Sequence, residues 1–523
     1  MRNIGENSRL RLYCIIIFFG FSFIVYGLLT YGGVRAPDSE IVFRTAESLA
    51  SRSSFAVSDE LAVWRRFGLT KGKGGGLYSV FGPGQAVVCA PFIKVAKVIN
   101  KTGWYQGKKV PLSHYVGNDY LDYFNNNVYP QNIEPHALRF IISFFNALVT
   151  SISVVLFFLL MERLTQSVAS AAWVAVFFAF GTLMFPYSGT FLSEPLATLL
   201  LIGSFLNMLY GEYHDSCGKI RFVTAFFLSG LLLGLATAVH ITAILFVPFF
   251  FIYVVYSSFK RFDIFSDRMF LSFAWAAGLM VPLIFLGYHN YARFGNIFET
   301  GRTANPNAIY STFVAPWRGL AGLLWSGGKG IIWYNPAAIV GLLLWGYFYR
   351  YKRFLSIILL CSVLFRFLFI ASRSDWHGGF CIGPRYMLML TPFLLIPFGF
   401  YMKEVFIGNQ RRKLFVMTLL LFLCISEQII FCLGEVFSFF HMARDLGAAK
   451  GFNVFHNDFI YFDWNFSPFL HILHGKRGPW ILQEVAWSNG TLMLLGMGIA
   501  AFCVLGLYLL SVRFCNDSAK EKI

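Results

Sequence analysis

Two acidic residues, Asp38 and Glu40, stand just after the first long apolar segment of the chain. A carboxylate at the boundary between water and a low-dielectric medium can take a proton from an attacking hydroxyl group, which is general base catalysis. Pro37 directly precedes the pair, and Pro and acidic residues also favour the first turn of any helix. The pair is therefore either a helix-capping feature or part of a catalytic site.

A third acid, Glu194, stands between Ser193 and Pro195 at the start of another apolar segment. An ionisable group at the edge of a membrane helix is costly and by default indicates function or a buried partner. Ser and Pro in these positions also suit an ordinary helix start. The topology derived below puts Glu194 on the same side of the membrane as Asp38, which favours a functional role.

Four cations also lie in segments that we place on that side: Arg293, Arg302, Lys329 and Arg385. Arg385 is the strongest phosphate-binding candidate, because it follows a Gly-rich loop and a guanidinium can bind a phosphate through two parallel hydrogen bonds. Each cation could instead extend to ordinary lipid phosphates. Their occurrence on one side, against the usual charge bias, indicates binding of an anionic lipid head group.

Three aromatic residues, Tyr78, Trp376 and His377, are the side chains that we expect to line a sugar or acceptor pocket. Clustered carboxylates and His377 could bind a divalent metal, but no metal-ligand spacing occurs, so we predict no required cofactor. Cys89 and Cys381 fall in external segments, and two cysteines make no disulfide framework, so we expect no disulfide.

The composition requires a membrane protein. Of 523 residues, 57% are hydrophobic and 13% are charged. The apolar residues come in blocks of about twenty, the length that crosses a hydrocarbon core of roughly 30 Å. The net charge of +17 comes from Lys and Arg scattered between these blocks, without the continuous basic stripe of a nucleic-acid-binding protein.

The charge distribution between apolar blocks predicts the topology. The first block, 12–31, follows three arginines and is too long for a signal-peptide core, so we expect a retained helix with a cytoplasmic amino end. Every second loop after it is basic, which places both termini in the cytoplasm. Eleven further spans are predicted, near residues 138–160, 168–186, 191–210, 222–239, 241–257, 269–288, 335–349, 354–371, 386–402, 414–434 and 489–512.

The loops on the opposite side are unequal, and three are long: about 32–137, 289–334 and 437–488. Helical patterning at 39–50 and 85–99 predicts amphipathic helices on the membrane surface within the first of them. The predicted fold is therefore all-α, with about twelve membrane helices. We expect a catalytic region over 1–400 and additional membrane helices over 401–523.

The order of several short motifs resembles the integral-membrane glycosyltransferases of the GT-C class, in particular the protein O-mannosyltransferases (glycosyltransferase family 39) and the lipid A aminoarabinose transferases. Each motif is short, and the specificity lies in their order along most of the first 400 residues. The matching pieces are Asp38 and Glu40, Gly76 to Gln85, Arg139 with Asn146, Ser193 to Pro195, Gly230 to Gly234, Arg293 to Gly295, Gly322 to Pro336, and Gly383 to Tyr386.

The resemblance implies a polyprenyl-phosphate-linked sugar as donor and an extracytoplasmic site. It implies that Asp38 acts on the acceptor hydroxyl, that Glu40 supports it, and that Glu194 is a second carboxylate of the site. We expect a single inverting displacement, with Arg385, helped by Arg293 or Lys329, stabilising the leaving phosphate. Relatives often carry Lys where this chain has Val80, so one phosphate contact of the family is missing or supplied elsewhere.

A polytopic transporter or lipid flippase is the alternative, because it also has about twelve helices and scattered internal charges. Its site should lie near the bilayer midplane, in broken helices. The candidate residues here gather at the outer boundary, which favours the enzyme, and a scaffold without chemistry would need no such convergence of acids and cations. We expect the acceptor to be a lipid, glycan or protein, and the location to be a bacterial inner membrane.

Overall fold

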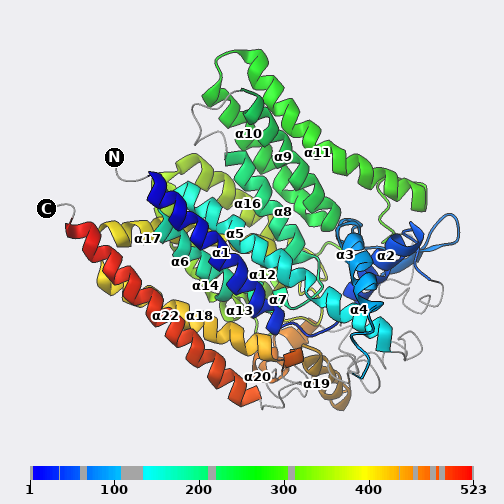
Figure 1. The fold of residues 1–523 in the computed structure, drawn as a ribbon. Helices are drawn as coiled ribbons and strands as arrows, with labels where there is room; N and C mark the ends of the chain where they lie inside the picture. Colours follow the sequence, from blue (N-terminus) through cyan, green and yellow to red (C-terminus); the bar gives the residue numbers. More distant parts are fainter. Residues whose placement is uncertain are drawn as a thin grey trace. The chain divides into compact units, whose positions relative to one another are not determined.

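The computed structural model describes residues 4–34, 36–58, 68–107, 133–209, 219–303, 312–434, 436–451, 458–471, 479–481 and 489–520 (Figure 1). They form two compact units. Unit 1 comprises Met1–Leu29, Thr150–Ser188 and Val314–Ile523, and unit 2 comprises Thr30–Val149 and Gly189–Phe313. Parts of the predicted loops 32–137, 289–334 and 437–488 lie outside the described residues.

Unit 2 combines the first long loop with a group of apolar helices. The loop supplies α2 (Pro37–Arg52), the antiparallel pair β1 (Leu69–Lys71) and β2 (Leu77–Ser79), α3 (Gly84–Asn100) and α4 (Ile133–Ser143). The helices are the first turn of α5 (Phe145–Thr165), α8 (Glu194–Met208), α9 (Lys219–Val239), η6 (Ile241–Phe246), α10 (Val247–Arg261) and α11 (Phe265–Phe294). α2 and α3 confirm the two amphipathic helices predicted at 39–50 and 85–99.

α3 shows why the amphipathic pattern was visible in the sequence. Its face with Ala86, Cys89 and Ile93 is buried in unit 2, where α3 packs against α2, α4 and α9. Its other face exposes Val95 and Val98, at 60% and 64%. An apolar face that the described part of its unit leaves exposed is the pattern of a helix on a membrane surface.

α9 and α11 cross at a distance that only glycine allows. A Cβ on Gly230 would lie 2.0 Å from the carbonyl oxygen of Trp275, and one on Gly278 would lie 2.1 Å from that of Phe227. Gly234, one turn along α9, faces Leu279 in the same way. Small residues let membrane helices approach closely and gain packing energy along their backbones. The Gly230 to Gly234 motif therefore has a structural role.

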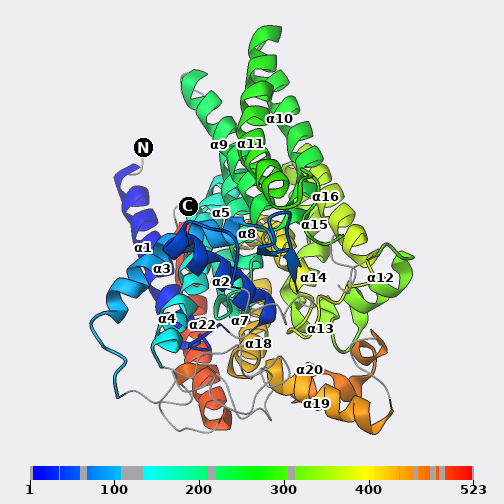
Figure 2. The same cartoon turned by 90° about the vertical axis from the view of Figure 1, so that its right-hand side faces the viewer.

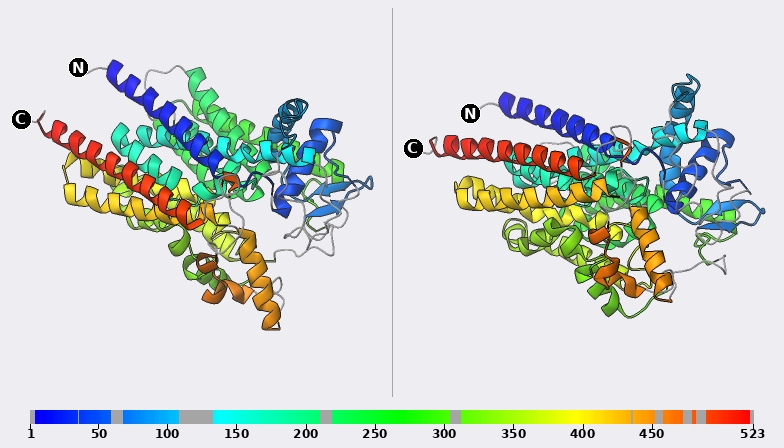
Figure 3. Two further views of the ribbon diagram at one scale, coloured as in Figure 1. Left: turned by 60° about the horizontal axis from the view of Figure 1, so that its bottom comes forward. Right: turned by 90° about the horizontal axis from the view of Figure 1, so that it is seen from below.

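Unit 1 is built around α17 (Thr391–Ile407), which is buried over most of its length. It packs against α6 (Val168–Phe180), α14 (Pro336–Leu343), α15 (Trp345–Tyr351), α16 (Arg353–Ala371) and α18 (Arg411–Leu433). α22 (Asn489–Lys520) runs alongside α18 (Figure 3). Other elements are α1 (Ile4–Leu28), the rest of α5, α7 (Met184–Ser188), α12 (Pro316–Trp325), α13 (Ile331–Tyr334), η7 (Arg385–Leu390), α19 (Val436–Ala449), η8 (Asp458–Tyr461), η9 (Trp464–Phe466) and α20 (Pro468–His471).

All twelve predicted membrane segments are helical, but three are short. Among the described residues, nine helices are long and apolar enough to cross a membrane. The segments predicted at 168–186 and 191–210 contain α6 and α8, of 13 and 15 residues. The segment predicted at 335–349 is divided at Leu344 into α14 and α15. Apolar composition predicted where the helices lie, but not where short breaks interrupt them.

We predict that Gly278→Leu destabilises unit 2, because its side chain would have to occupy the space of the Phe227 carbonyl. Small-to-large changes in packed interiors cost about 1–3 kcal/mol and occasionally more. Thermal unfolding of the purified protein in detergent measures the effect. Gly287→Ala is the matched control on the same helix, because its Cβ would have 3.8 Å to the nearest atom. Equal melting temperatures for the two variants would contradict the close crossing.

Candidate functional site

Glu40 of unit 2 is held by two arginines. Its carboxylate accepts hydrogen bonds from Arg139 Nε, at 3.0 Å to Oε2, and from Arg139 Nη2 to Oε1. Arg44 Nε adds a contact of 2.8 Å. Glu40 and Arg139 are both 1% exposed, and Arg139 also donates to the carbonyl of Pro135 on α4. This buried pair fixes α2 of the first loop on α4.

The contacts of Glu40 decide its chemical character. Burial alone would raise the pKa of its carboxyl, but the guanidinium groups of Arg139 and Arg44 outweigh burial and hold the pKa below 4.5. Because the pKa is lowered in the folded state, the pair stabilises the fold above pH 4.5, and this contribution is lost as pH falls through the lowered pKa. A carboxylate engaged in this way is a weak base, which suits a supporting role.

Asp38 lies in the first turn of α2 and is half-buried. Residues two apart on a helix do not face each other, so Asp38 leaves α2 in a different direction from Glu40. Ala36, the N-cap residue before the helix, supplies no side-chain cap, and Pro37 is the first residue of α2. The Glu40–Arg139 pair therefore sets the position of the turn that carries Asp38.

Glu194 is the first residue of α8 and is 2% exposed. Its Oε1 lies 4.0 Å from Nε2 of His240, whose Nδ1 is 2.9 Å from the Thr242 hydroxyl. The turn before Glu194 is held by two amides: Gln85 donates to the Phe191 carbonyl at 3.1 Å, and Asn146 donates to the Leu192 carbonyl at 2.8 Å. The motifs that contain Gln85 and Asn146 thus position Glu194.

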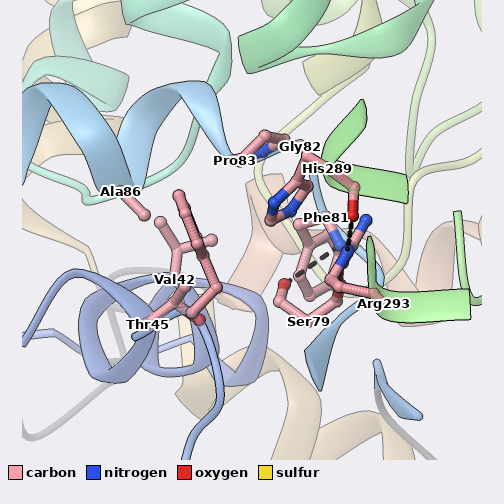
Figure 4. A pocket seen from close by; sticks show the side chains of 10 residues that line it. Val42, Thr45, Ser79, Phe81, Gly82, Pro83, Ala86, His289 and Arg293 are labelled. Atoms are coloured by element: carbon pink, nitrogen blue, oxygen red, sulfur yellow. Dashed lines mark hydrogen bonds between the residues drawn. The ribbon is translucent and has the colours of Figure 1, made fainter. Parts of the chain in front are cut away.

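Unit 2 also contains a small, partly open cavity between the first loop and the end of α11 (Figure 4). Val42 and Thr45 of α2 lie on one side, and Ser79, Phe81, His289 and Arg293 lie on the other. Phe55, Gly82, Pro83 and Ala86 complete the lining. The wall is therefore mostly apolar, with one guanidinium group in it.

Arg293 is 5% exposed and donates to three neutral oxygens. These are the carbonyl of Ser79 at 2.6 Å, the side chain of Asn290 at 2.7 Å and the carbonyl of His289 at 3.3 Å. Within the described part of the chain its guanidinium forms no ion pair, although the carboxylate of Glu299 is near enough to act on its charge. A buried cation beside an apolar cavity favours binding of an anion.

Two other predicted residues of unit 2 do not line this cavity. Tyr78 alternates with Ser79 along β2, so its ring points to the other face of the strand and lies 6.1 Å from the ring of Phe294. Arg302 is half-exposed in the loop after α11. Their predicted roles in the sugar pocket and phosphate site stay predictions.

In unit 1, Lys329 is fully buried and holds a loop by its ammonium group. Nζ donates at 2.7 Å to the carbonyls of Gly379 and of Cys381, and at 3.3 Å to that of Gly383. Burial lowers the pKa of Lys329, and the nearby Arg385 guanidinium lowers it further while Cys381 opposes this. Because its protons are directed at carbonyls, Lys329 organises the loop before Arg385.

His377 and Arg385 border the same loop of unit 1. The His377 ring stacks on Tyr461, with 4.3 Å between the ring centroids. Burial and the nearby cations Lys329 and Arg385 lower the pKa of His377 to about 3, although the Asp375 carboxylate acts in the opposite direction. His377 is therefore neutral at pH 7. The half-buried Arg385 passes beside Gly378, where a Cβ would lie 3.1 Å from Arg385 Cγ. Trp376 is 2% exposed and packs under α12.

Sequence reasoning missed Arg139 as the partner of Glu40, and it missed Arg366. Arg366 is fully buried on α16 and donates to the carbonyl of Tyr386 at 2.8 Å, directly after Arg385. Its signal was an arginine inside the apolar block 354–371. Among the described residues, no group of three His, Cys, Asp or Glu could hold a metal, and Cys89 and Cys381 are free thiols.

Part of the chain matches a known protein family. Residues 96–298 match the family described as dolichyl-phosphate-mannose-protein mannosyltransferase, and no curated protein sequence matches the chain. The matched segment contains Arg139, Glu194 and Arg293, whereas Asp38 and Arg385 lie outside it.

Two solved structures are similar to the chain. Apo ArnT from Cupriavidus metallidurans is 12% identical with a TM-score of 0.50, and the match covers 96% of this chain and 76% of that chain. The archaeal oligosaccharyltransferase AglB from Archaeoglobus fulgidus is 11% identical with a TM-score of 0.44, covering 98% of this chain and 56% of that chain. The likeness to ArnT confirms the predicted all-α membrane fold.

We predict that Arg139→Met destabilises the protein by about 3–5 kcal/mol, the usual cost of leaving one charge of a buried pair without its partner. Arg44→Met is the matched control, because Arg44 is 17% exposed and Arg139 still neutralises Glu40 in that variant. Unfolding in detergent at neutral pH measures both. The double variant Glu40→Gln/Arg139→Met should recover part of the lost stability. If Arg139→Met unfolded like the parent protein, the Glu40–Arg139 ion pair would not hold α2 on α4.

Proposed function

We propose that this chain, a membrane glycosyltransferase of the GT-C class, transfers a sugar from a polyprenyl-phosphate-sugar donor to an acceptor hydroxyl group. The family that matches residues 96–298 is named for a dolichyl-phosphate-linked mannose donor. The match to a glycosyltransferase family over residues 96–298 favours this activity over a transporter or flippase.

The cavity beside Arg293 carries the proposal. A polyprenyl phosphate carries an anionic phosphate on an apolar chain. The cavity has matching parts: a guanidinium that makes no ion pair in the described region, and apolar walls formed by Val42, Phe55 and Phe81. A cation held by neutral oxygens keeps its attraction for a phosphate, and that attraction is strong where water is excluded. The first-loop helix that carries Asp38 forms one wall of this cavity.

The proposed reaction is a single displacement at the anomeric carbon. The acceptor oxygen forms a bond to this carbon as the bond to the phosphate oxygen breaks, with inversion of configuration. Asp38 takes the proton of the acceptor hydroxyl. The electron pair of the broken bond stays on the polyprenyl phosphate, which leaves as an anion, so no covalent intermediate with the protein is needed.

The acids are proposed to have different roles. Glu40 is bound by two guanidinium groups, so its part is to position α2, and Asp38 is the better base. Glu194, beside His240, is proposed as a second carboxylate that orients the acceptor or sugar. In unit 1, Arg385 is proposed as a phosphate contact, and Lys329 supports it by ordering the loop 379–383.

The proposed location of the reaction is the extracytoplasmic side of a bacterial inner membrane, with both termini in the cytoplasm. The first loop and Arg385 follow the ends of apolar segments whose other ends carry the Lys and Arg clusters. Cytoplasmic loops hold such clusters, so Asp38 and Arg385 are assigned to the opposite side.

We predict that Asp38→Asn abolishes sugar transfer while the variant inserts and unfolds like the parent protein. The amide keeps the size of the side chain but cannot accept the acceptor proton, and general base catalysis contributes roughly 10²- to 10⁴-fold in rate. Transfer of a labelled sugar from a polyprenyl-phosphate donor in proteoliposomes measures the loss. Glu47→Gln, on the same helix, is the matched control that should retain activity, and full transfer by the Asp38 variant would refute the assignment.

We predict that Arg293→Met weakens donor binding roughly 10- to 100-fold, the range expected for loss of one charge-assisted contact. Arg293→Lys should recover part of this binding, because it keeps the charge. The matched control is Lys94→Met, since Lys94 is an exposed cation of α3 that does not line the cavity. The KM for the donor measures both, and an equal effect of the two Met variants would remove the cavity from the donor site.

A further inference from the structure

α12 of unit 1 presents an apolar stripe that the described residues of its unit leave exposed, apart from a ring contact of Trp325 with Trp333. Trp317, Ala321, Leu324 and Trp325 recur at the spacing of one helical face, and all four are exposed. The two tryptophans are 75% and 62% exposed. The opposite face, with Gly319, Gly322 and Leu323, is buried. α12 is thus amphipathic, with large aromatic side chains at both ends of its free face.

The depth of α12 relative to a membrane follows from its contacts with α16 (Figure 2). α16 has 19 residues, which span about 28 Å and match a hydrocarbon core of roughly 30 Å. A Cβ on Gly319 would lie 2.1 Å from the carbonyl of Ala371, the last residue of α16, and Val314 N–H donates to the Ser372 carbonyl at 2.8 Å. α12 therefore lies at the edge of the hydrocarbon core.

α16 itself carries a lipid-facing stripe that leads to this edge. Ile357, Leu364, Phe365 and Leu368 are each 45–48% exposed and, with the exposed Cys361, lie on one face of the helix. Leu368 is one turn before the residues that contact α12. Trp residues concentrate where the acyl region meets the head groups, because one part of the ring is apolar and its N–H is polar.

We propose that α12 lies in the plane of the membrane interface, with its Trp317–Trp325 face against the acyl chains, and holds the loop 376–385 at the depth of the lipid phosphates. The occupant of this face is the bilayer. The second clause, on the loop, rests on the proposed function; the first does not.

A series of contacts joins α12 to the cations of unit 1. A Cβ on Gly322 would lie 2.2 Å from the Trp376 ring, so α12 rests directly on this ring. Trp376 precedes His377, which stacks on Tyr461, and the Lys329 ammonium lies 5.3 Å from the centroid of the same Tyr461 ring. Lys329 then binds the carbonyls that lead to Arg385. The depth of α12 thus determines the depth of this loop.

A nitroxide label at Ala321→Cys tests the proposal in the full chain reconstituted in nanodiscs, with Cys14, Cys217, Cys361, Cys503 and Cys515 replaced by serine. We expect the label to be relaxed by oxygen, which dissolves in the acyl region, and protected from a water-soluble nickel complex. Native Cys361, retained alone, is the lipid reference, and Lys450→Cys, in an exposed position of unit 1, is the aqueous control. Relaxation by nickel like that of Lys450→Cys, or protection from both reagents by a protein contact, would overturn the proposal.

A second measurement tests the link to the loop. Trp317→Ser/Trp325→Ser should raise the KM for the long-chain donor roughly tenfold, with kcat unchanged, because the chemistry is untouched and the loop loses its anchor. If the label at position 321 is in lipid but this KM is unchanged, α12 contacts the bilayer without setting the depth of the loop. The proposed role of α12 in holding the loop 376–385 would then be wrong. If the label is in lipid and the parent protein transfers no sugar, only the proposed function fails.

Discussion

The buried ion pair between Glu40 and Arg139 is the contact on which the first-loop site of unit 2 depends. It joins α2 to α4 across 99 positions of sequence, and both side chains are removed from water. Removing two charges from water costs several kcal/mol for each, so such a pair is retained only when its geometry is well satisfied. Here the hydrogen-bonding groups of both side chains are satisfied by the bidentate contact between them, by the additional bond from Arg44 to Glu40 and by the bond from Arg139 to the Pro135 carbonyl. The consequence is a rigid first turn, and Asp38 stands in that turn.

The buried cations of the protein are balanced in different ways, and the difference matters for function. Arg139 is neutralised by a carboxylate, so it contributes little net potential. Arg293 in unit 2 and Lys329 in unit 1 donate to neutral carbonyl and amide oxygens, which satisfy their hydrogen bonds and leave their charge. A buried cation without an ion pair favours an anionic ligand, which supports the proposal of a polyprenyl phosphate. Lys329 makes its contribution through the loop that it orders.

Apolar composition and loop charges predicted the membrane fold, and the helical pattern after Pro37 and after Gly84 predicted α2 and α3. These features are local, and residues a few positions apart suffice to reveal them. The role of Glu40 could not be predicted in this way, because its main partner, Arg139, is distant in sequence and arrives only through packing of α4. The same holds for Lys329, whose protons meet carbonyls 50 to 54 positions later. Side chains alternate along β2, so Ser79 faces the cavity and Tyr78 points away from it. The sequence did not reveal this alternation, because a strand of three residues is too short for a periodic pattern.

The central claim is an inverting transfer from a lipid-phosphate-linked sugar, and the stereochemistry of the product tests it most directly. Purified protein in proteoliposomes would be given a polyprenyl-phosphate donor of known anomeric configuration and an acceptor alcohol, and the product would be analysed by NMR together with the released lipid. We predict one free polyprenyl phosphate for each sugar transferred and the opposite anomeric configuration in the product. Retention of configuration, or a sugar bound covalently to the protein during turnover, would contradict it.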